Sequence, residues 1–478
     1  MKKTIILIIL LHSIFCYSQT PLTLNQAIEI AQQSSLQTQI NTQNFEIGKQ
    51  SFRRDNATLL PQINLNGNLP GYNNSISSIT QPDGTIKFTT VEQAYSTGIL
   101  SLNQKILATG GSLNINSGLN RFDRLTGVKS TNWQSQPINI NLSQPIFQFN
   151  NFKFSRKIAK LNNQLNSKTY IESKEVIALQ VSQQFFTSLL SQQNLTLVQY
   201  NKNITDTLFA VAKTKLNLGK IDEDEFLQIN LQVIGYANVL SAAQINYYNN
   251  MAVLLLLLNA KENYVLKNEI PKQQFIIERE LAIQQAFKNR SDALQEQLNL
   301  ENQIANLSIN NYKRLPNFTL NATYGLNQQS PIFNEVYKNA LPQQLASVGV
   351  NMPIISFGAN NANYKIAQHQ LNKQKLQQDL FYKNLAITIT KNIADYNLYS
   401  QNYKLSVQAD SIAQKRFAIA LNKYNIGKIT YTDLFIAQQQ KDKAITDLIQ
   451  NQQNYWNAYY TLRKNTLYDF ENGRRLVE

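Results

Sequence analysis

The chain has 478 residues and a formal net charge of +15, with 43% hydrophobic residues, one cysteine and two histidines. Because Cys16 lies in a predicted leader, the mature chain has no thiol for disulfides, thiol catalysis or thiolate metal sites. The basic residues are interspersed and form no cluster, which argues against nucleic acid as a partner. His369 is the only mature histidine and no catalytic or phosphate-binding motif is present, so we predict that the chain is not an enzyme and has no cofactor or metal.

Residues 1–18 are predicted to be a secretory signal peptide. Two lysines precede an apolar run at 5–11, and Cys16 begins a small-x-small cleavage pattern. The apolar run is much shorter than the ~20 residues of a spanning helix, which argues against a membrane anchor. Acylation of Cys16 is disfavoured because bulky Phe15 stands where such signals carry a small residue. We therefore expect export from the cytoplasm.

The remaining chain contains the same landmarks twice. The pattern Ala-x-x-x-Ala followed by a Leu-Pro pair begins at Ala27 and again at Ala282, an offset of 255 (282 − 27). A Gly-Lys-Ile sequence at Gly219 recurs at Gly427, an offset of 208 (427 − 219). The first copy therefore has 47 extra residues (255 − 208). We predict two structural repeats, residues 19–260 and 261–478.

Each repeat is predicted to open with a helix, over 24–56 and 278–313, followed by two strands. The strands are expected at 61–69, 137–143, 317–326 and 346–355. Aliphatic residues alternate along them with Asn, Ser or Thr, as in Ile63 and Leu65 against Asn64 and Asn66. This pattern fits strands with lipid on one face and water on the other; a soluble antiparallel sheet with one wet face is the alternative. Four prolines are predicted to open the strands: Pro61, Pro145, Pro316 and Pro353.

The extra residues fall in a segment inserted between the first two strands, at 70–136. Two strand-like stretches, 95–102 and 112–119, are joined by a plausible turn at 108–111. We predict that the insertion forms a strand-rich loop outside the cell, with added barrel strands as the alternative. Four strands per chain are too few to enclose a channel, whereas three chains would supply twelve. This interpretation requires a trimer.

Two very long helices are predicted from stretches that lack Gly and Pro. One has 73 residues between Pro145 and Gly219 (218 − 145), and the other has 68 between Gly358 and Gly427 (426 − 358). Helices of this size would be on the order of 100 Å long. Seven-residue spacing of apolar residues, from Ile389 onward, indicates coiled-coil packing. Further helical runs follow at 223–260 and 432–467, so the two glycines near 219 and 427 are predicted to be the tips of antiparallel helical hairpins.

In this order the landmarks resemble the TolC-like outer-membrane factor family of outer-membrane efflux proteins. The resemblance covers essentially the whole mature chain. Its most specific marker is Tyr424-Asn-Ile-Gly427 followed by Asp433-Leu434, which is similar to the family's Tyr-x-x-Gly and Asp-Val-Leu at that spacing. The first copy has Gly219 and, in the matching acidic position, Glu225.

The resemblance implies a mixed α/β membrane protein with an internally duplicated TolC-like fold. Its long antiparallel coiled-coil helices would form an α-barrel in the periplasm, and four strands per chain would form a trimeric antiparallel transmembrane β-barrel in the outer membrane. A small equatorial belt would draw on residues 259–274 and on the C-terminal tail.

The implied function is passive conduction from the periplasm to the exterior, in a tripartite efflux pump or a type I secretion system. The implied partners are two further copies of the chain, a periplasmic adaptor, an inner-membrane transporter and outer-membrane lipid. The alternative is a surface or periplasmic coiled-coil protein such as an adhesin stalk, which needs heptads but no paired alternating strands. The sequence leaves the transported substrate and the type of pump open.

The hairpin tips are the candidate gate at the periplasmic end. The family can carry a second acid three residues after Asp433, but this chain has Ile436. The first copy instead has an acidic run at 222–225, which is either a solvated helix start that suits the helix dipole or a ring that attracts cations. Like charges of Glu225 and Asp433 repel one another, and the closed state is expected to be held by neighbours such as Lys220, Lys428, Tyr424 or Tyr431 through ion pairs or hydrogen bonds. The predicted tip residues are Gly219, Lys220, Glu225, Tyr424, Gly427, Lys428 and Asp433.

Overall fold

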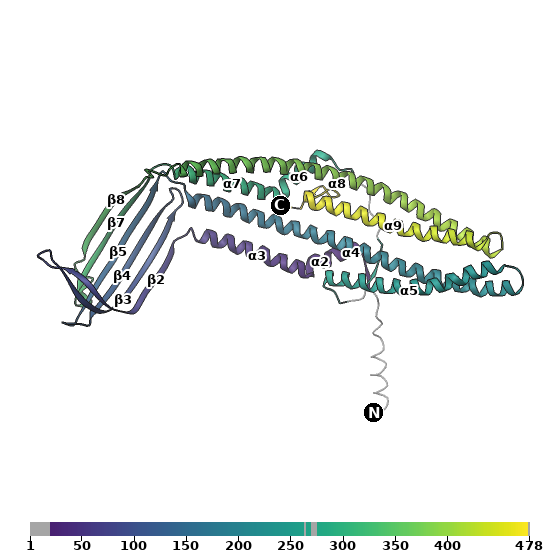
Figure 1. Ribbon diagram of the computed structural model, residues 1–478, viewed down its shortest axis with the longest axis horizontal. Helices are drawn as coiled ribbons and strands as arrows, with labels where there is room; N and C mark the ends of the chain where they lie inside the picture. The colour runs from purple at the N-terminus through teal and green to yellow at the C-terminus, as the bar shows by residue number, and fades with distance from the viewer. Residues whose placement is uncertain (1–19, 262–263, 269–274, 477–478) are drawn as a thin grey trace, which may run out of the picture. The chain divides into compact units, whose positions relative to one another are not determined.

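The computed structural model describes residues 20–261, 264–268 and 275–476. The predicted signal peptide lies outside these residues, as do positions 262–263 and 269–274 of the expected belt. The chain forms two compact units, one mainly of helices and one built on a sheet (Figure 1).

The first unit, called the helical unit below, takes Met1–Glu46, Ser167–Ala293 and Leu380–Glu478. The second, the sheet unit, takes Ile47–Asn166 and Leu294–Asp379. Among the residues that the structure describes, every helix falls short of the combined length and apolarity needed to cross a membrane.

The helices have matching lengths in the two copies. The longest, α4 and α8, have 67 residues each, and their hairpin partners, α5 and α9, have 36 each. The starts of both pairs are separated by 208 positions (359 − 151 and 431 − 223). The helices of the first copy are α2 (Leu24–Ser34), α3 (Leu36–Ala57), α4 (Asn151–Asn217) and α5 (Glu223–Leu258). Those of the second are α6 (Arg279–Asn289), α7 (Ser291–Tyr312), α8 (Ala359–Asn425) and α9 (Tyr431–Thr466).

The opening helix of each copy is broken, so the expectation of single helices over 24–56 and 278–313 is wrong. The breaks fall at Ser35 and Arg290, which are 255 positions apart (290 − 35) and have extended backbones with ψ of 148° and 145°. The Ser35 hydroxyl accepts a hydrogen bond from the Thr38 amide at 3.1 Å. It therefore satisfies an amide in the first turn of the next helix, which is how serine starts a helix.

One antiparallel six-stranded sheet forms the centre of the sheet unit (Figure 1). The expectation of four strands is therefore wrong. The insertion at 70–136 contributes two full strands, β3 and β4, instead of a separate loop. In sheet order the strands are β2 (Gln62–Thr80), β3 (Ile86–Ile106), β4 (Gly111–Arg124), β5 (Ser130–Ile146), β7 (Asn317–Ser330) and β8 (Leu341–Asn351). A 3₁₀ turn, η1 (Phe333–Glu335), lies between β7 and β8.

The strand register places apolar side chains on one face across the sheet. Residues directly opposite one another in a ladder share a face. One such row runs through Ile63, Leu102, Ile115, Ile140 and Tyr324, each paired with the next. Two bulges shift the register, one in β2 between Asn68 and Gly71 and one in β5 near residues 136–138, which shifts the pairing of β5 with both of its neighbours. Each bulge adds one residue to its strand, so the alternation of side chains between the two faces of the sheet reverses at that point. This reversal compensates for the changed spacing of the apolar residues beyond the bulge.

Two of the four prolines open strands. Pro61 and Pro316 come directly before β2 and β7, where no ladder amide is needed. The expectation is wrong for Pro145, which lies near the end of β5, and for Pro353, which follows the end of β8 at Asn351. Pro145 is tolerated because the pairing of β4 with β5 has already ended at Ser143. The predicted strand 346–355 therefore stops four residues early (355 − 351).

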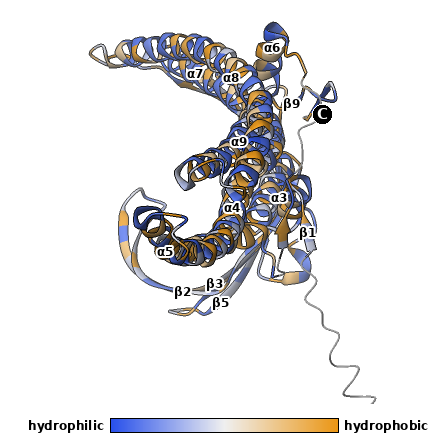
Figure 2. Cartoon of the chain, turned by 90° about the vertical axis from the view of Figure 1, so that its right-hand side faces the viewer, coloured by the Kyte–Doolittle hydropathy of each residue, from blue (hydrophilic) through white to orange (hydrophobic). Residues whose placement is uncertain are grey.

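Short strands link distant parts of the helical unit. Strand β1 (Thr20–Leu22) pairs in parallel with β6 (Tyr264–Leu266), and β9 (Tyr468–Asp469) pairs with β10 (Arg474–Arg475) in the tail. The main apolar core beneath them draws on both copies of the repeat, with buried side chains from α2, α4, α5, α6, α8 and α9. Figure 2 shows hydrophobic and hydrophilic residues interspersed along the helices, as expected for helices that bury only one stripe.

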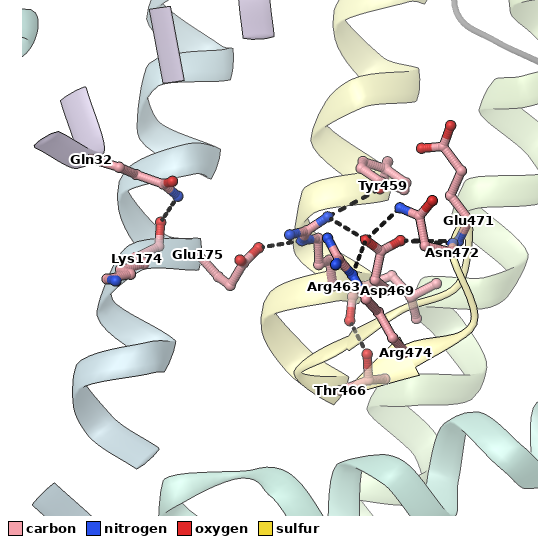
Figure 3. Close-up of polar contacts among 11 residues, drawn as sticks. Gln32, Lys174, Glu175, Tyr459, Arg463, Thr466, Asp469, Glu471, Asn472 and Arg474 are labelled. Atoms are coloured by element: carbon pink, nitrogen blue, oxygen red, sulfur yellow. Dashed lines mark hydrogen bonds and ion pairs between the residues drawn. The ribbon is translucent and has the colours of Figure 1, made fainter. Parts of the chain in front are cut away.

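A partly buried guanidinium joins the two copies to the C-terminal tail (Figure 3). Arg463 Nε, on α9, lies 2.7 Å from Glu175 Oε2 on α4, and Nη1 lies 3.2 Å from Asp469 Oδ2 in the tail. The two carboxylate side chains are only 6% and 1% exposed. Burial raises the pKa of Glu175, and Arg463 opposes that rise. Asp469 also accepts hydrogen bonds from the backbone amides of Glu471 and Asn472.

Replacing this arginine should destabilise the helical unit strongly. In Arg463→Ala the buried Glu175 carboxylate loses its ion-pair partner, and the buried Asp469 carboxylate is left with a longer ion pair to Arg474 at 3.9 Å, so the free energy of unfolding should fall by about 3–5 kcal/mol. Denaturant titration followed by circular dichroism measures the change. Lys443→Ala is the matched control, because Lys443 forms an exposed pair with Asp447 and should change stability by less than about 0.5 kcal/mol. Equal changes in the free energy of unfolding for the two variants would contradict the role of Arg463 as the charge partner of Glu175 and Asp469.

Candidate functional site

The helical hairpins turn at two glycines with left-handed backbones. Gly219 has φ of +64° and Gly427 has φ of +73°. In both turns the glycine amide donates to the third residue before it, and the following lysine amide donates to the fifth residue before it, at 2.8–2.9 Å. These are the two bonds of a Schellman motif. A Cβ at either position would meet no atom within 4 Å, so glycine is required by its backbone conformation and not by space.

The two hairpin tips pack together into one apolar cluster. Tyr424 and Tyr431 lie with ring centroids 6.1 Å apart, and Phe209 stacks on Phe226 at 5.4 Å. All four helices of the hairpins contribute, so the tips of the two copies are joined within one chain. The buried members of this tip cluster are Leu208, Ala212, Ile229, Phe417, Ala420, Tyr424, Tyr431, Leu434 and Ala437.

The equivalent acids of the two tips, Glu225 and Asp433, have different partners. Asp433 belongs to the capping box of its own helix: its Oδ2 accepts from the Thr430 amide and hydroxyl at 3.2 and 2.8 Å. Glu225 instead accepts a hydrogen bond at 3.1 Å from the Tyr424 hydroxyl. Since Glu225 is on α5 and Tyr424 on α8, this bond connects the two hairpins.

The tyrosines of the tip are neutral hydrogen-bond donors at physiological pH. Burial, and then the neighbouring Glu225 carboxylate, raise the pKa of Tyr424 well above its ordinary value. Burial raises the pKa of Tyr431 to about 12. Lys215 Nζ lies 5.1 Å from the centre of the Tyr424 ring, close enough for a cation–π contact.

The charged residues just beyond the turns are exposed. Lys220 and Lys428 have no hydrogen bond or ion pair with another side chain in the described part of the chain. Of the side chains expected to hold the tip closed, Tyr424 is the one for which the described residues show a polar bond between the hairpins. Asp222 caps α5 by accepting from the Glu225 amide at 2.8 Å. Part of the acidic run therefore acts as a helix start.

Sequence reasoning missed several polar contacts between the hairpins. The Thr432 hydroxyl donates to Gln228 at 3.3 Å. Lys441 is 8% exposed and pairs with Asp442, while its ammonium lies between two rings, 4.8 Å from Tyr200 and 4.4 Å from Phe417. A lysine is recognisable in sequence, but its position between aromatic rings on two other helices is not.

The second candidate site is the polar face of the sheet. Asn103, Asn114, Asn141 and Thr323 lie in one row, each directly opposite the next. The Asn114 amide donates to Asn103, and the Thr323 hydroxyl donates to Asn141 at 2.8 Å. In this row carboxamides and hydroxyls take the places that aliphatic residues occupy on the opposite face, so at this level one face of the sheet is apolar and the other carries uncharged polar side chains.

The remaining chemistry of the described residues offers no metal centre. No group of three or more His, Cys, Asp or Glu side chains in that part of the chain is arranged to hold a metal ion. His369 is exposed on α8.

Comparison with known proteins gives a family match over part of the chain and a fold for nearly all of it. A model of the outer membrane efflux protein family matches residues 282–466. No curated protein sequence matches the chain. The Campylobacter jejuni CmeC outer membrane channel has a TM-score of 0.67 at 14% identity, over 95% of this chain and 87% of that chain.

Two further solved structures have the same fold. The outer membrane protein VceC of Vibrio cholerae has a TM-score of 0.63 at 13% identity, over 93% of this chain and 95% of that chain. The open state of the Neisseria gonorrhoeae MtrE outer membrane channel has a TM-score of 0.62 at 13% identity, over 93% of this chain and 88% of that chain.

Alanine at the tip glycine should have the opposite effect from alanine inside a helix. Gly427→Ala forces a Cβ into the left-handed region and should lower the free energy of unfolding by about 1–2 kcal/mol. Gly235, inside α5, also has open space around it, and Gly235→Ala should stabilise by up to about 1 kcal/mol. Denaturant titration measures both variants. Two changes of the same sign would argue against the turn assignment.

Proposed function

We propose that this chain is a member of the outer membrane efflux protein family, whose model matches its second half, and that it is the outer-membrane channel of an export system. The channel conducts substrates passively from the periplasm to the exterior. It receives them from an inner-membrane transporter through a periplasmic adaptor, in an efflux pump or a type I secretion system. The active form is a trimer with a β-barrel in the membrane and an α-barrel in the periplasm.

The two-faced sheet is the observation that carries this proposal. An apolar row and a carboxamide row run across neighbouring strands on opposite faces. A soluble sheet with one wet face would cover its apolar face with other elements, yet Leu65, Val348 and Val350 are each more than half exposed. Lipid on the apolar face and water on the carboxamide face satisfy both sets of side chains. An adhesin stalk has no use for such a sheet.

Both units contain unpartnered surfaces that favour association of identical chains. The outer edges of β2 and β8 have no strand partner among the described residues, and each unpaired backbone group would cost several kcal/mol in lipid. In the helical unit, apolar residues recur along α8 at intervals of seven, and each of their side chains is more than half exposed. Exposed heptad rows are expected to pack against other helices. The row consists of Leu398, Leu405, Ile412, Ile419 and, directly after the helix ends, Ile426.

The hairpin tips are proposed to form the periplasmic entrance. The Glu225–Tyr424 bond and the tip cluster hold the two hairpins of one chain together. The closed entrance then depends on a small number of contacts that an adaptor can replace, which makes it a shallow minimum. The exposed acids of the α5 start, together with Glu225 and Asp433 on three chains, would attract cations to this entrance.

A charge in the α8 row should prevent trimer formation. Ile412→Asp places a carboxylate where the row packs against another chain, so light scattering of the detergent-solubilised variant should give the mass of a monomer. Ser411→Asp is the matched control, since this exposed neighbour lies about 100° around the helix. A monomeric wild type would refute the trimer, and a trimeric Ile412→Asp variant would refute the role of the row.

Removing the two equivalent acids should change conduction. We expect the double variant Glu225→Ala with Asp433→Ala to show higher single-channel conductance, or weaker block by divalent cations, in planar bilayers. Asp447→Ala is the control, because it removes an exposed acid of α9 that lies well away from the tip, and it should resemble wild type. Trimer mass must stay unchanged in all variants. If the double variant had the conductance of the wild type and the same block by divalent cations, Glu225 and Asp433 would have no role in conduction and would serve only at the starts of their helices.

A further inference from the structure

We propose that the membrane sheet closes with eighteen strands, six from each of three chains, and encloses a pore about half again as wide as twelve strands would. The inference rests on the proposed function for its trimer. Its own basis is the structure of the segment at 70–136, for which the sequence analysis predicted a loop outside the cell, with added barrel strands as the alternative.

The inserted strands are integral to the sheet. Strand β3 pairs with β4 over fourteen positions, from Gln93 to Ile106, and β4 continues the pairing to β5. The apolar row from Ile63 to Tyr324 passes through both inserted strands without interruption. If β3 and β4 left the barrel as a loop, β2 and β5 would have to pair directly, and the structure does not pair them.

Only the distal part of one hairpin extends past the rest of the sheet. Asn74–Thr80 of β2 pairs with Ile86–Glu92 of β3, and β4 pairs with β3 no further than Gln93. This distal hairpin has two strands where the remainder has six. The distal hairpin therefore extends the sheet along the strand direction at one place, but it adds no strand to the circumference of the ring.

The free edges can close the ring with a second and third copy. All six strands alternate in direction, so β2 and β8 run oppositely, and the junction between chains continues the antiparallel order. An even number of strands per chain is required for this. Both edges also have the same two faces: Leu65 and Val348 lie on the apolar face, while Asn64 and Ser347 lie on the polar face.

Strand number sets the radius. With strands about 4.8 Å apart and tilted by about 40°, eighteen strands give a backbone radius of about 18 Å, and twelve give about 12 Å. Equivalent residues of the three chains would then be about 30 Å apart in the first case and about 20 Å in the second. The wider ring leaves room for a water-filled lumen lined by the carboxamide face.

Distance measurement between chains tests the strand number. Because Cys16 is the only native cysteine and lies in the predicted leader, Ala322→Cys provides one nitroxide site per mature chain. Double electron–electron resonance on the detergent-solubilised trimer should give a backbone separation near 30 Å after correction for the label. A value near 20 Å would overturn the proposal while leaving the trimer and the channel function intact. A monomer would give no distance between chains and would refute the proposed function itself.

A shortened chain is the matched control. Deleting Thr80–Lys129 and joining Ile79 to Ser130 through Asn-Gly leaves four strands, with both joined residues on the polar face of the present sheet. If this variant assembles, its separation should fall to near 20 Å. An unchanged separation would contradict the inference that β3 and β4 widen the ring. The measurement on the full chain decides the strand number even if the deletion prevents folding.

Cross-linking tests which edges meet. Leu65→Cys combined in turn with Ala346→Cys, Val348→Cys or Val350→Cys places both thiols on the apolar face, and at least one combination should give disulfide-linked trimers. Leu65→Cys with Ser347→Cys is the control, because thiols on opposite faces cannot meet. Absence of a link in all three combinations would overturn the pairing of β2 with β8.

Discussion

The unpaired edges of the six-stranded sheet impose the constraint on which the proposed assembly depends. Every interior strand has partners on both sides, but β2 and β8 each leave one side of the backbone open within the described chain. In water such an edge is satisfied by solvent, whereas in hydrocarbon it must pair with another strand. Because β2 and β8 run oppositely, identical copies can supply that strand for one another. The proposed closure of the ring and the proposed pore width thus depend on the same backbone groups.

In the helical unit the two copies have the same backbone geometry but different side-chain interactions. The hairpins of the two copies have the same lengths and the same glycine turns, yet Glu225 bonds across to Tyr424 while Asp433 bonds within its own helix. Arg463 likewise has ion-pair partners on α4 and in the tail, whereas Leu255, 208 positions earlier (463 − 208), has no charge. Backbone geometry is repeated, and the groups that connect the copies are not.

Much of the fold was predictable because local patterns specified it. The glycine turns followed from the end of a stretch without Gly or Pro, and the tip geometry followed from the preference of glycine for left-handed conformations. The faces of β2, β5, β7 and β8 followed from alternation. The break at Ser35 was missed because a mid-helix serine is common, and only its bond to Thr38 starts a new helix there. Pro145 was misassigned because its tolerance depends on where the neighbouring strand ends.

By itself the sequence determined the repeat, the helical hairpins, the uncharged alternating strands and the candidate tip residues, because all of these depend on spacing along the chain. Only the tertiary structure decided that β3 and β4 join the sheet, that Glu225 and not Asp433 meets Tyr424, and that Arg463 lies between Glu175 and Asp469. These features pair groups that are distant in sequence. Their partners are selected by packing and by the need to satisfy buried polar groups, neither of which has a local signature.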